Sequence, residues 1–480
     1  MSPELLKNIA FLVYITSTIC FILGLKRTTK VSTARSGNRL AAVGMLLAVV
    51  GTLIELGVID DYRWIVGGMV AGGLIGGLMA KRVEMTEMPE LVALLNGFGG
   101  ASSALVALSV VWSEVVEVAT AEQTVAELVT GGAASAVTIA LSVIIGSITL
   151  TGSVIALLKL KEKLNKGAPI MLPARHMINA VLLLAAVGGI GYLGFVAVGP
   201  DDVVVAALAV TAVSLVLGVL LVIPIGGADM PVVVSLLNSY SGIAAAMAGF
   251  VINNPLLIVV GATVGAAGLI LTQIMCVAMN RSLLNVLVGG FGANEGADLG
   301  DQEYHSVTSC GPEEAAMVLD AAESVIIIPG YGLAVAQAQH TCRELADEMI
   351  KRGTKVTYAI HPVAGRMPGH MNVLLAEADV PYEQLIEMDQ INGEFKNTDA
   401  VIVVGANDVV NPANTDPKSP IYGMPILNAH EARSVFIIKR SLSPGYAGIK
   451  NELFDNPNAM MVYGDAKKIM QQMTTELKEL

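Results

Sequence analysis

The chain has 480 residues, of which 15% are charged, and its mean hydropathy is +0.65. A water-soluble globular protein carries about a quarter charged residues, so this composition excludes a wholly soluble protein. The net charge of −12 argues against nucleic-acid binding, which depends on basic residues that neutralise phosphates. No metal site is expected, because the spacing between Cys20, Cys276, Cys310 and Cys342 matches no cysteine motif that binds zinc or haem.

Apolar runs follow one another through residues 5–280, whereas residues 300–480 have an ordinary globular composition. A membrane-spanning helix needs roughly 20 apolar residues. This length predicts about nine transmembrane helices, at 5–25, 40–59, 64–80, 91–112, 133–158, 177–198, 203–222, 232–251 and 257–279. The predicted organisation is a polytopic helical membrane domain over 1–290, a polar linker over 291–311 and a soluble domain over 312–480.

The loops that connect the apolar runs differ in charge. Lysine and arginine follow the first, third and fifth runs, and the even-numbered loops are acidic or neutral. Positive residues are retained on the cytoplasmic side of a membrane, so this pattern predicts an external N-terminus and a cytoplasmic C-terminal domain. The basic residues are Lys26, Arg27, Lys30, Arg35, Arg39, Lys81, Arg82, Lys159, Lys161, Lys163, Lys166 and Arg175.

A ten-residue pattern, M-P-x-x-V-x-L-L-N-small, occurs at 88–97 and again at 230–239. An acidic residue precedes each copy, and in the second copy this residue is Asp229. The proline of each copy suits the first turn of a helix. Asn96 and Asn238 then lie about 10 Å inside the inner face, at 1.5 Å per residue. An amide in hydrocarbon must find polar partners, so both should face the interior of the bundle.

Two roles remain open for these asparagines. They could join helices by hydrogen bonds, or they could line a polar proton path with Ser147, Thr149, Thr151 and Ser241. Glu55, near the outer end of the second span, could accept a proton or could extend its carboxylate to the membrane surface.

Short β-branched runs alternate with helical stretches in the soluble part. We expect strands at 324–329, 355–360, 384–388, 400–404, 435–439 and 460–463, and helices at 334–352 and 466–480. This alternation predicts an α/β domain with a parallel doubly wound sheet.

The first of these strands leads into a Gly-x-Gly turn, Gly330 and Gly332, and then into a helix, as in dinucleotide-binding sites. Val335 or Ala336 stands where the third glycine of that motif is usual. The second strand ends in His361 without the acid that binds the ribose hydroxyls of NAD, which favours NADP.

Further polar groups follow other strands of the predicted sheet. Lys439, Arg440 and Ser441 could capture a phosphate, or they could form a solvated basic turn. Asp408 follows another strand, where it could bind a ribose or the nicotinamide, or cap the next helical turn.

Long stretches of the chain resemble the β subunit of the proton-translocating NAD(P) transhydrogenases, along nearly the full length. In the membrane part they are 85–92, 226–242 (GGADMPVVVSLLNSYSG) and 279–282. In the soluble part they are 329–339 (PGYGLAVAQAQ), 361–378, 405–412 and 439–448.

The resemblance implies that the soluble domain binds NADP(H), in an orientation reversed relative to ordinary Rossmann enzymes. It also implies a separate α subunit that carries NAD(H), a dimer of αβ units, and a location in the bacterial inner membrane with a periplasmic N-terminus. Hydride would pass from one nicotinamide to the other while a proton crosses the membrane. Some family members carry a proton-transferring histidine at the position of Asn96, and asparagine cannot titrate.

The site residues that follow from the motifs and the resemblance fall into three groups. Asp408 is the catalytic candidate, and the proton path or its coupling would use Glu55, Asn96, Ser147, Asp229 and Asn238. The cofactor-binding candidates are Gly330, Tyr331, Gly332, Ala334, Val335, Ala336, Arg366, Pro368, Gly369, His370, Met371, Asn372, Gly405, Ala406, Asn407, Asp408, Lys439, Arg440, Ser441, Gly445, Tyr446, Ala447, Gly464, Asp465 and Ala466.

The rival hypothesis is a transporter or channel regulated by a nucleotide-sensing domain. A transporter should show more charge inside the membrane than these runs contain. The transhydrogenase hypothesis requires a partner chain, because this sequence has one dinucleotide motif. A soluble oxidoreductase with a membrane anchor does not need about nine spans.

Overall fold

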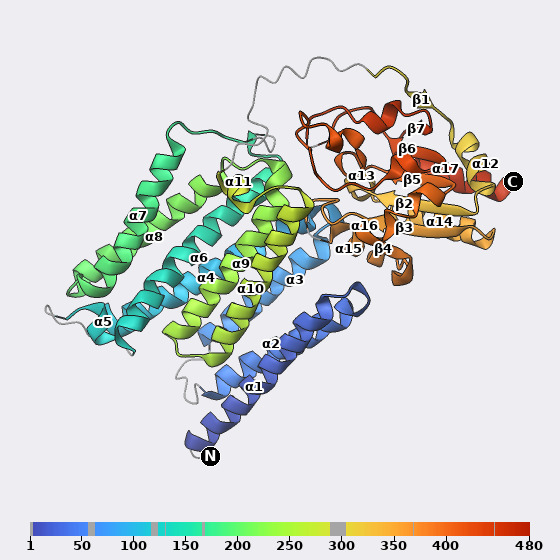
Figure 1. Cartoon of the computed structure of the whole chain (residues 1–480). Helices are drawn as coiled ribbons and strands as arrows, with labels where there is room; N and C mark the ends of the chain where they lie inside the picture. The colour runs from blue at the N-terminus through green and yellow to red at the C-terminus, as the bar shows by residue number, and fades with distance from the viewer. Residues whose placement is uncertain are drawn as a thin grey trace. The chain divides into compact units, whose positions relative to one another are not determined.

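The computed structural model describes residues 3–55, 63–116, 123–129, 131–165, 169–288, 304–367, 369–445 and 447–480. The chain divides into two compact units (Figure 1). The first unit comprises Met1–Leu158, Leu172–Ile223 and Val234–Leu271. The second unit comprises Lys159–Met171, Pro224–Val233 and Thr272–Leu480.

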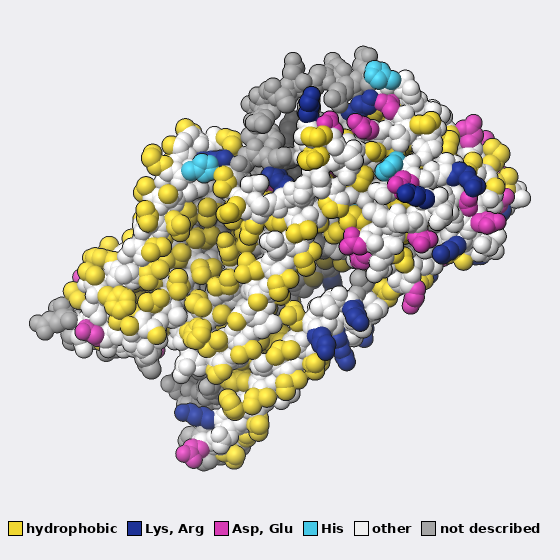
Figure 2. All heavy atoms as spheres, viewed as in Figure 1, with side chains coloured by type: hydrophobic (Ala, Val, Ile, Leu, Met, Phe, Trp, Pro, Cys, Tyr) yellow, Lys and Arg dark blue, Asp and Glu magenta, His cyan; other side chains and the backbone are white. Residues whose placement is uncertain are grey.

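Nine helices of the described residues are long and apolar enough to cross a membrane, which confirms the predicted number. A helix satisfies its own backbone hydrogen bonds, which is the condition for crossing hydrocarbon. On the face shown in Figure 2, hydrophobic side chains cover these helices along their length. The helices are α1 (Pro3–Thr28), α2 (Val31–Glu55), α3 (Arg63–Arg82), α4 (Met88–Val110, continued by the π-helical turn η2, Val111–Val116), α6 (Gly132–Leu160), α7 (Arg175–Phe195), α8 (Pro200–Val222), α9 (Met230–Val251) and α10 (Pro255–Ala278). The shorter helices α5 (Val125–Leu128) and α11 (Leu283–Val288) accompany them.

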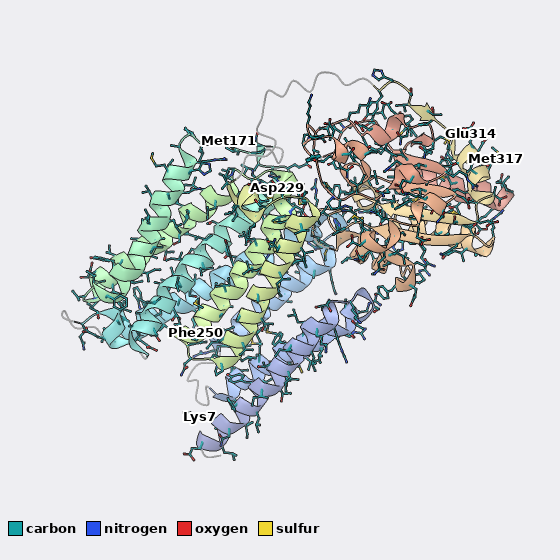
Figure 3. All side chains as sticks on the ribbon, viewed as in Figure 1. Lys7, Met171, Asp229, Phe250, Glu314 and Met317 are labelled. Atoms are coloured by element: carbon teal, nitrogen blue, oxygen red, sulfur yellow. The ribbon has the colours of Figure 1, made fainter. Side chains whose placement is uncertain are left out.

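The two copies of the repeated pattern have the same local structure. A 3-10 turn that ends in an acidic residue precedes each helix, at η1 (Met85–Glu87) before α4 and at η4 (Gly227–Asp229) before α9. Proline is the second residue of each helix, where the missing N–H costs no hydrogen bond. Asp229 and Phe250 mark the two ends of α9 in Figure 3.

A parallel sheet of seven strands forms the centre of the second unit, in the order β1-β7-β6-β5-β2-β3-β4. From β4 to β7 this is the strand order of doubly wound dinucleotide-binding domains, and it confirms the predicted sheet. The order reverses at β2 and β5, whose carboxyl ends therefore flank the crevice where ligands bind in such sheets. The strands are β1 (Thr308–Ser309), β2 (Ser324–Pro329), β3 (Lys355–Ile360), β4 (Leu385–Glu387), β5 (Ala400–Val404), β6 (Ser434–Lys439) and β7 (Ala459–Tyr463).

The sheet is covered on both faces, as its apolar strands require. Helices α12 (Pro312–Asp320), α14 (Gln339–Lys351) and α17 (Ala466–Glu479) pack together on one face. The other face packs against a hydrophobic cluster that includes Phe395, Leu427 and Phe454. The remaining helices are α13 (Tyr331–Val335), α15 (His370–Glu377) and α16 (Met388–Ile391), with 3-10 turns η5 (Tyr382–Gln384), η6 (Phe395–Asn397), η7 (Asp408–Val410), η8 (Pro412–Thr415), η9 (Ala429–Glu431) and η10 (Glu452–Asp455).

Two features differ from the sequence prediction. The prediction of one continuous helix at 334–352 was wrong. Gln337 adopts a left-handed φ of +47°, and this residue separates α13 from α14. Strand β1 lies inside the stretch 291–311 that we expected to be a linker, and it pairs with β7 at the edge of the sheet.

Candidate functional site

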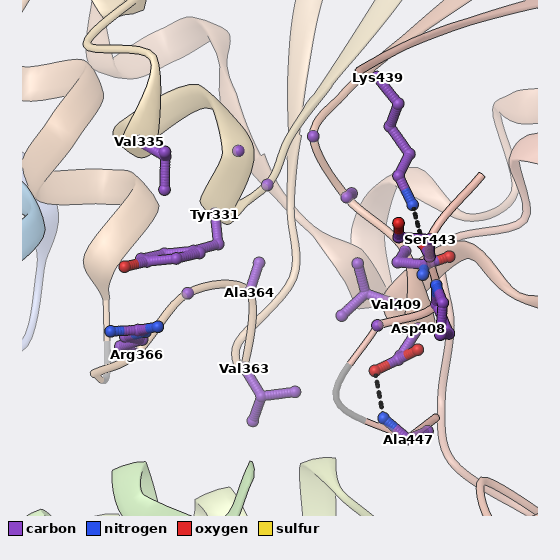
Figure 4. A pocket seen from close by; sticks show the side chains of 18 of the residues that line it. Tyr331, Val335, Val363, Ala364, Arg366, Asp408, Val409, Lys439, Ser443 and Ala447 are labelled. Carbon is purple, nitrogen blue, oxygen red and sulfur yellow. Dashed lines mark hydrogen bonds between the residues drawn. The ribbon is translucent and has the colours of Figure 1, made fainter. Parts of the chain in front are cut away.

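A cavity of about 690 Å³ opens at the carboxyl ends of β2, β5 and β6. Pockets for small ligands and cofactors have volumes of about 300–1,000 Å³. Figure 4 shows Tyr331, Val335 and Arg366 on one side of the cavity, and Asp408 and Lys439 on the other. The position is the crevice that the strand order predicts.

Glycines at this crevice let two turns interlock. Gly332 N–H donates to Gly405 O at 2.9 Å, and Gly330 N–H donates to Val404 O at 2.9 Å. A Cβ atom on Gly332 would lie 2.6 Å from the Cα of Gly405, closer than real contacts allow. Gly405 itself has a φ of +62°, which favours glycine. The Gly-x-Gly motif is therefore required by contact of one turn with the other, in addition to any approach of a ligand.

The first wall of the cavity combines an aromatic ring and a cation. The Arg366 guanidinium lies over the Tyr331 ring, 4.4 Å from its centroid. Behind this pair, the buried His370 accepts a hydrogen bond at Nδ1 from Arg366 N at 3.1 Å. His370 thus shapes the loop that carries Arg366 and is not among the residues that line the cavity.

His361, at the end of β3, is held as a neutral ring. Burial lowers the pKa of His361 to about 4, although the carbonyl of Pro425 opposes this shift. Its Nδ1 accepts from Val363 N at 3.2 Å, so its Nε2 donates to Pro425 O at 2.9 Å. His361 therefore fixes the loop after β3 and supplies no positive charge.

The second wall carries the basic group at the end of β6. Lys439 donates from Nζ to Ser443 O at 2.7 Å. Burial lowers the pKa of Lys439 to about 8, and the Asp408 carboxylate acts in the opposite direction. Arg440 is exposed and lines the same cavity with Ser441.

Asp408 contacts the loop that follows this basic group. We call residues 440–445 and 447–449 the covering loop. Ala447 N donates to Asp408 Oδ2 at 3.0 Å, and a Cβ on Gly445 would lie 2.7 Å from that same oxygen. Asp408 therefore holds the covering loop by a backbone hydrogen bond, and only a residue without a side chain fits beside the carboxylate.

Most cofactor-binding candidates line the cavity, namely Gly330, Tyr331, Gly332, Val335, Ala336, Arg366, Gly405, Ala406, Asn407, Asp408, Lys439, Arg440, Ser441, Gly445, Ala447, Gly464, Asp465 and Ala466. Among the described residues, five other candidates do not line the cavity, namely Ala334, Gly369, His370, Met371 and Asn372. Pro368 and Tyr446 lie outside the described residues.

Sequence reasoning missed several lining residues, including Val363, Ala364, Gly365 and Ser443. The first three directly follow β3, so the rule that ligands bind at strand ends could have found them. Ser443 has no comparable signal, because it contributes through the loop conformation and its carbonyl oxygen.

Polar side chains join the helices of the first unit. The buried Asn96 donates from Nδ2 to Val234 O at 3.2 Å, which links α4 to α9. Ser142 donates to Ser103 O at 3.0 Å, and Thr151 donates to Leu215 O at 2.8 Å. Ser147, which lies on α6 between Ser142 and Thr151, is also buried. Asn238 is half-buried on α9, and the side chain of Glu55 lies outside the described residues.

Asp229 forms a buried ion pair in the second unit. Arg281 Nη1 donates to both carboxylate oxygens of Asp229, at 2.7 and 2.8 Å. Burial raises the pKa of Asp229, and the Arg281 cation opposes that shift. The side chain of Asp229 is 3% exposed and that of Arg281 is 15% exposed, so the charges are largely withdrawn from water.

Comparison with known proteins identifies the family. The family described as NAD(P) transhydrogenase beta subunit matches residues 10–476 of the chain. The NAD(P) transhydrogenase subunit beta of Rhodospirillum rubrum is 47% identical over 468 residues, which cover 96% of this chain and 97% of the relative. A second sequence, from a named strain of the same organism, has the same identity and coverage. The chain therefore belongs to the NAD(P) transhydrogenase beta subunit family.

Proposed function

We propose that this chain binds NADP(H) in the cavity at the ends of β2, β5 and β6. The observation that carries the proposal is the half-buried Lys439 beside Arg440 and Ser441 at a strand's carboxyl end. These are donors suited to a 2′-phosphate. The loop after β3, residues 361–367, contains no acid that would repel such a phosphate.

The residues of the cavity suit the parts of a dinucleotide. The turns at Gly330 and Gly405 would allow close backbone approach, and Arg366 on Tyr331 offers a flat cationic surface. When bound, NADP(H) would supply the nicotinamide that carries the hydride. The chain's own residues bind and orient it. Asp408, the catalytic candidate, would bind the ribose or the nicotinamide and would hold the covering loop beside the cavity.

We further propose that hydride passes to or from NAD(H) on an α subunit while a proton crosses the membrane. The relatives' name, subunit beta, supports a partner subunit, and we propose a dimer of αβ units. Reconstitution of this chain in vesicles with an α subunit should give both transhydrogenation and a pH gradient. Activity from this chain alone would contradict the proposal.

For the membrane half we propose that Asn96, Asn238, Ser147 and Glu55 belong to a proton path in which water carries the proton. Support comes from the burial of Asn96 and Ser147 inside the helix bundle. Asparagine cannot titrate, so it would act by hydrogen bonding.

We also propose that the protein lies in a bacterial inner membrane with a periplasmic N-terminus and a cytoplasmic soluble domain. Basic residues in the last turns of α1, α3 and α6 support this orientation. Labelling of a cysteine placed at Lys478 should require permeabilised cells. Labelling in intact cells would contradict the proposed orientation and indicate an external soluble domain.

Replacing Arg440 with alanine should weaken NADP⁺ binding by about 10- to 100-fold, because a charge-assisted hydrogen bond contributes about 1.5–3 kcal/mol. NAD⁺ lacks the 2′-phosphate, so its weak binding should hardly change. The measurement is a titration of the αβ complex with each nucleotide. Lys355→Ala, which removes an exposed cation at the opposite end of the sheet, is the matched control. Equal losses for both nucleotides would contradict the assignment of Arg440 to the phosphate.

NADP⁺ affinity should fall about tenfold from pH 7 to pH 9. The pKa of Lys439 is lowered to about 8, so below pH 8 the ammonium is charged and binds the phosphate. As the pH rises through 8 the free lysine loses its proton, and the affinity gained from the charge is lost. The phosphate is a dianion throughout this range, since its second pKa is about 6. Lys439→Arg should remove the pH dependence, and a wild-type profile in that variant would contradict the assignment.

A further inference from the structure

Tyr304 is fastened to one short segment at the base of the covering loop. We call residues 304–309 the arm and residues 450–455 the anchor segment. The Tyr304 ring stacks on Phe454, with centroids 5.8 Å apart and planes inclined by 22°. The Lys450 ammonium lies 4.8 Å from the centre of the Tyr304 ring. Asn451 N donates to the Tyr304 hydroxyl at 3.2 Å. The ring and the hydroxyl of one side chain thus contact three residues of the anchor segment.

The backbone of the arm is held to the same segment. Asp455 Oδ1 accepts from His305 N at 3.1 Å and from Ser306 N at 3.2 Å. Asp455 also forms an ion pair with Lys450. The arm and the anchor segment are therefore joined by side-chain and backbone contacts over adjacent residues, and β1 then continues the arm along β7.

Tyr304 is connected to two residues of the cavity, in each case through one intervening residue. Asn451 is fully buried, and its Nδ2 donates to Asn407 O at 3.1 Å and to Asn407 Oδ1 at 2.9 Å. Asn407 lines the cavity next to Asp408. On the second route, the Lys439 ammonium lies 5.1 Å from the centre of the Phe454 ring. Tyr304 thus contacts the neighbours of two residues that we assign to the nucleotide.

The covering loop is attached at both ends. It begins after Lys439, the last residue of β6, and Lys450, the first residue of the anchor segment, follows its end. Asp408 holds it in the middle through Ala447. Arg440, Ser441 and Gly445 of this loop line the cavity, so a shift of the loop would alter the contacts of a bound ligand, and a firmly held end restricts that shift.

We infer that Tyr304 is a positioning residue of the nucleotide site, which fixes the anchor segment and so slows the release of NADP(H) bound against the covering loop. The inference rests on the proposed binding of NADP(H) in this cavity. Tyr304 does not line the cavity, so it acts through Asn451 and Phe454.

The test measures NADPH release from the whole αβ complex, by the loss of NADPH fluorescence after a chase with excess NADP⁺. Tyr304→Leu removes the stacking, the cation contact and the hydroxyl, and it should speed release about tenfold. Tyr304→Phe keeps the ring and loses one hydrogen bond, and it should speed release about threefold or less. The KM for NAD(H), which we assign to the α subunit, should stay unchanged in both variants.

Tyr382→Leu is the matched control, because it removes a ring of the same size from η5, whose residues do not line the cavity. Release at the wild-type rate from both Tyr304 variants would overturn the inference, even if their melting temperatures fell. If Tyr304→Leu does not assemble, Tyr304→Phe and Asp455→Asn decide the question by the same measurement. Failure of the wild-type complex to bind NADPH would instead overturn the proposed function.

Discussion

Replacement of Gly332 by alanine is expected to weaken NADP(H) binding by about 5- to 150-fold and to lower the melting temperature of the complex without nucleotide. The added Cβ would lie 2.6 Å from the Cα of Gly405, so a backbone segment must shift. Overpacking of this kind costs about 1–3 kcal/mol, and about 1.4 kcal/mol corresponds to a factor of ten in affinity. The shift would move the turns after β2 and β5, which form the floor of the crevice.

The two effects together distinguish two explanations of this glycine. If Gly332 only made room for a ligand, alanine would weaken binding and leave the nucleotide-free protein as stable as before. If one turn must pack against the other, stability falls without nucleotide as well. Gly393→Ala is the matched control, since a Cβ there meets no atom within 4 Å. Thermal unfolding with and without NADP⁺ gives both quantities, and an unchanged melting temperature without nucleotide would refute the packing explanation.

The strands and membrane helices could be predicted because segments that are buried in the protein or in the membrane have a continuous run of apolar residues. A parallel strand covered on both faces is apolar throughout, as in Ala400–Val404, and the predicted and observed strands agree within a residue or two. A membrane helix is likewise apolar over about 20 residues. The glycine turn and the basic group at β6 were found because the carboxyl ends of parallel strands meet at one edge.

Features that depend on tertiary contacts could not be predicted in this way. The break at Gln337 needs a left-handed residue that the sequence does not mark, because glutamine is compatible with a continuous helix. Strand β1 has two residues, too few for any periodicity, and it is a strand because β7 offers a free edge to pair with. Asn451 is distant in sequence from Asn407, and their contact follows from the fold alone.

The structure gives several glycines and asparagines a role that their sequence patterns do not show. The sequence pattern placed Gly330 and Gly332 in a turn of a dinucleotide site, and the structure adds a steric need that exists before any ligand binds. Asn96 was open to two roles, and its amide does join α4 to α9 through Val234 O. That bond occupies one donor of the amide, so the proposed proton path has to use water or neighbouring groups.

Asp229 lines the nucleotide cavity together with Arg281, and removal of its charge is expected to reduce proton pumping far more than it weakens NADP(H) binding. Asp229 closes the 3-10 turn that leads into α9, which carries Asn238, and it is paired with the largely buried Arg281. Asp229→Asn leaves the Arg281 cation without its counter-charge, a change that costs about 3–5 kcal/mol in buried pairs. We therefore expect proton uptake, driven by NADPH-dependent reduction of an NAD analogue in vesicles, to fall at least tenfold. Asp408→Asn should reduce it as well, because the covering loop loses a charged acceptor.

A double variant separates a structural role of the pair from a role in coupling. Asp229→Asn combined with Arg281→Gln removes both charges and leaves two amides that can bond to each other. If the pair only stabilises the fold, the double variant should regain most of the lost pumping, since no unpaired charge remains. If the carboxylate itself takes part in coupling, pumping stays low although the complex assembles and binds NADP⁺. Asp201→Asn, which alters an exposed acid in the first turn of α8, is the matched control. Wild-type proton uptake by Asp229→Asn vesicles would contradict any role of this carboxylate in coupling.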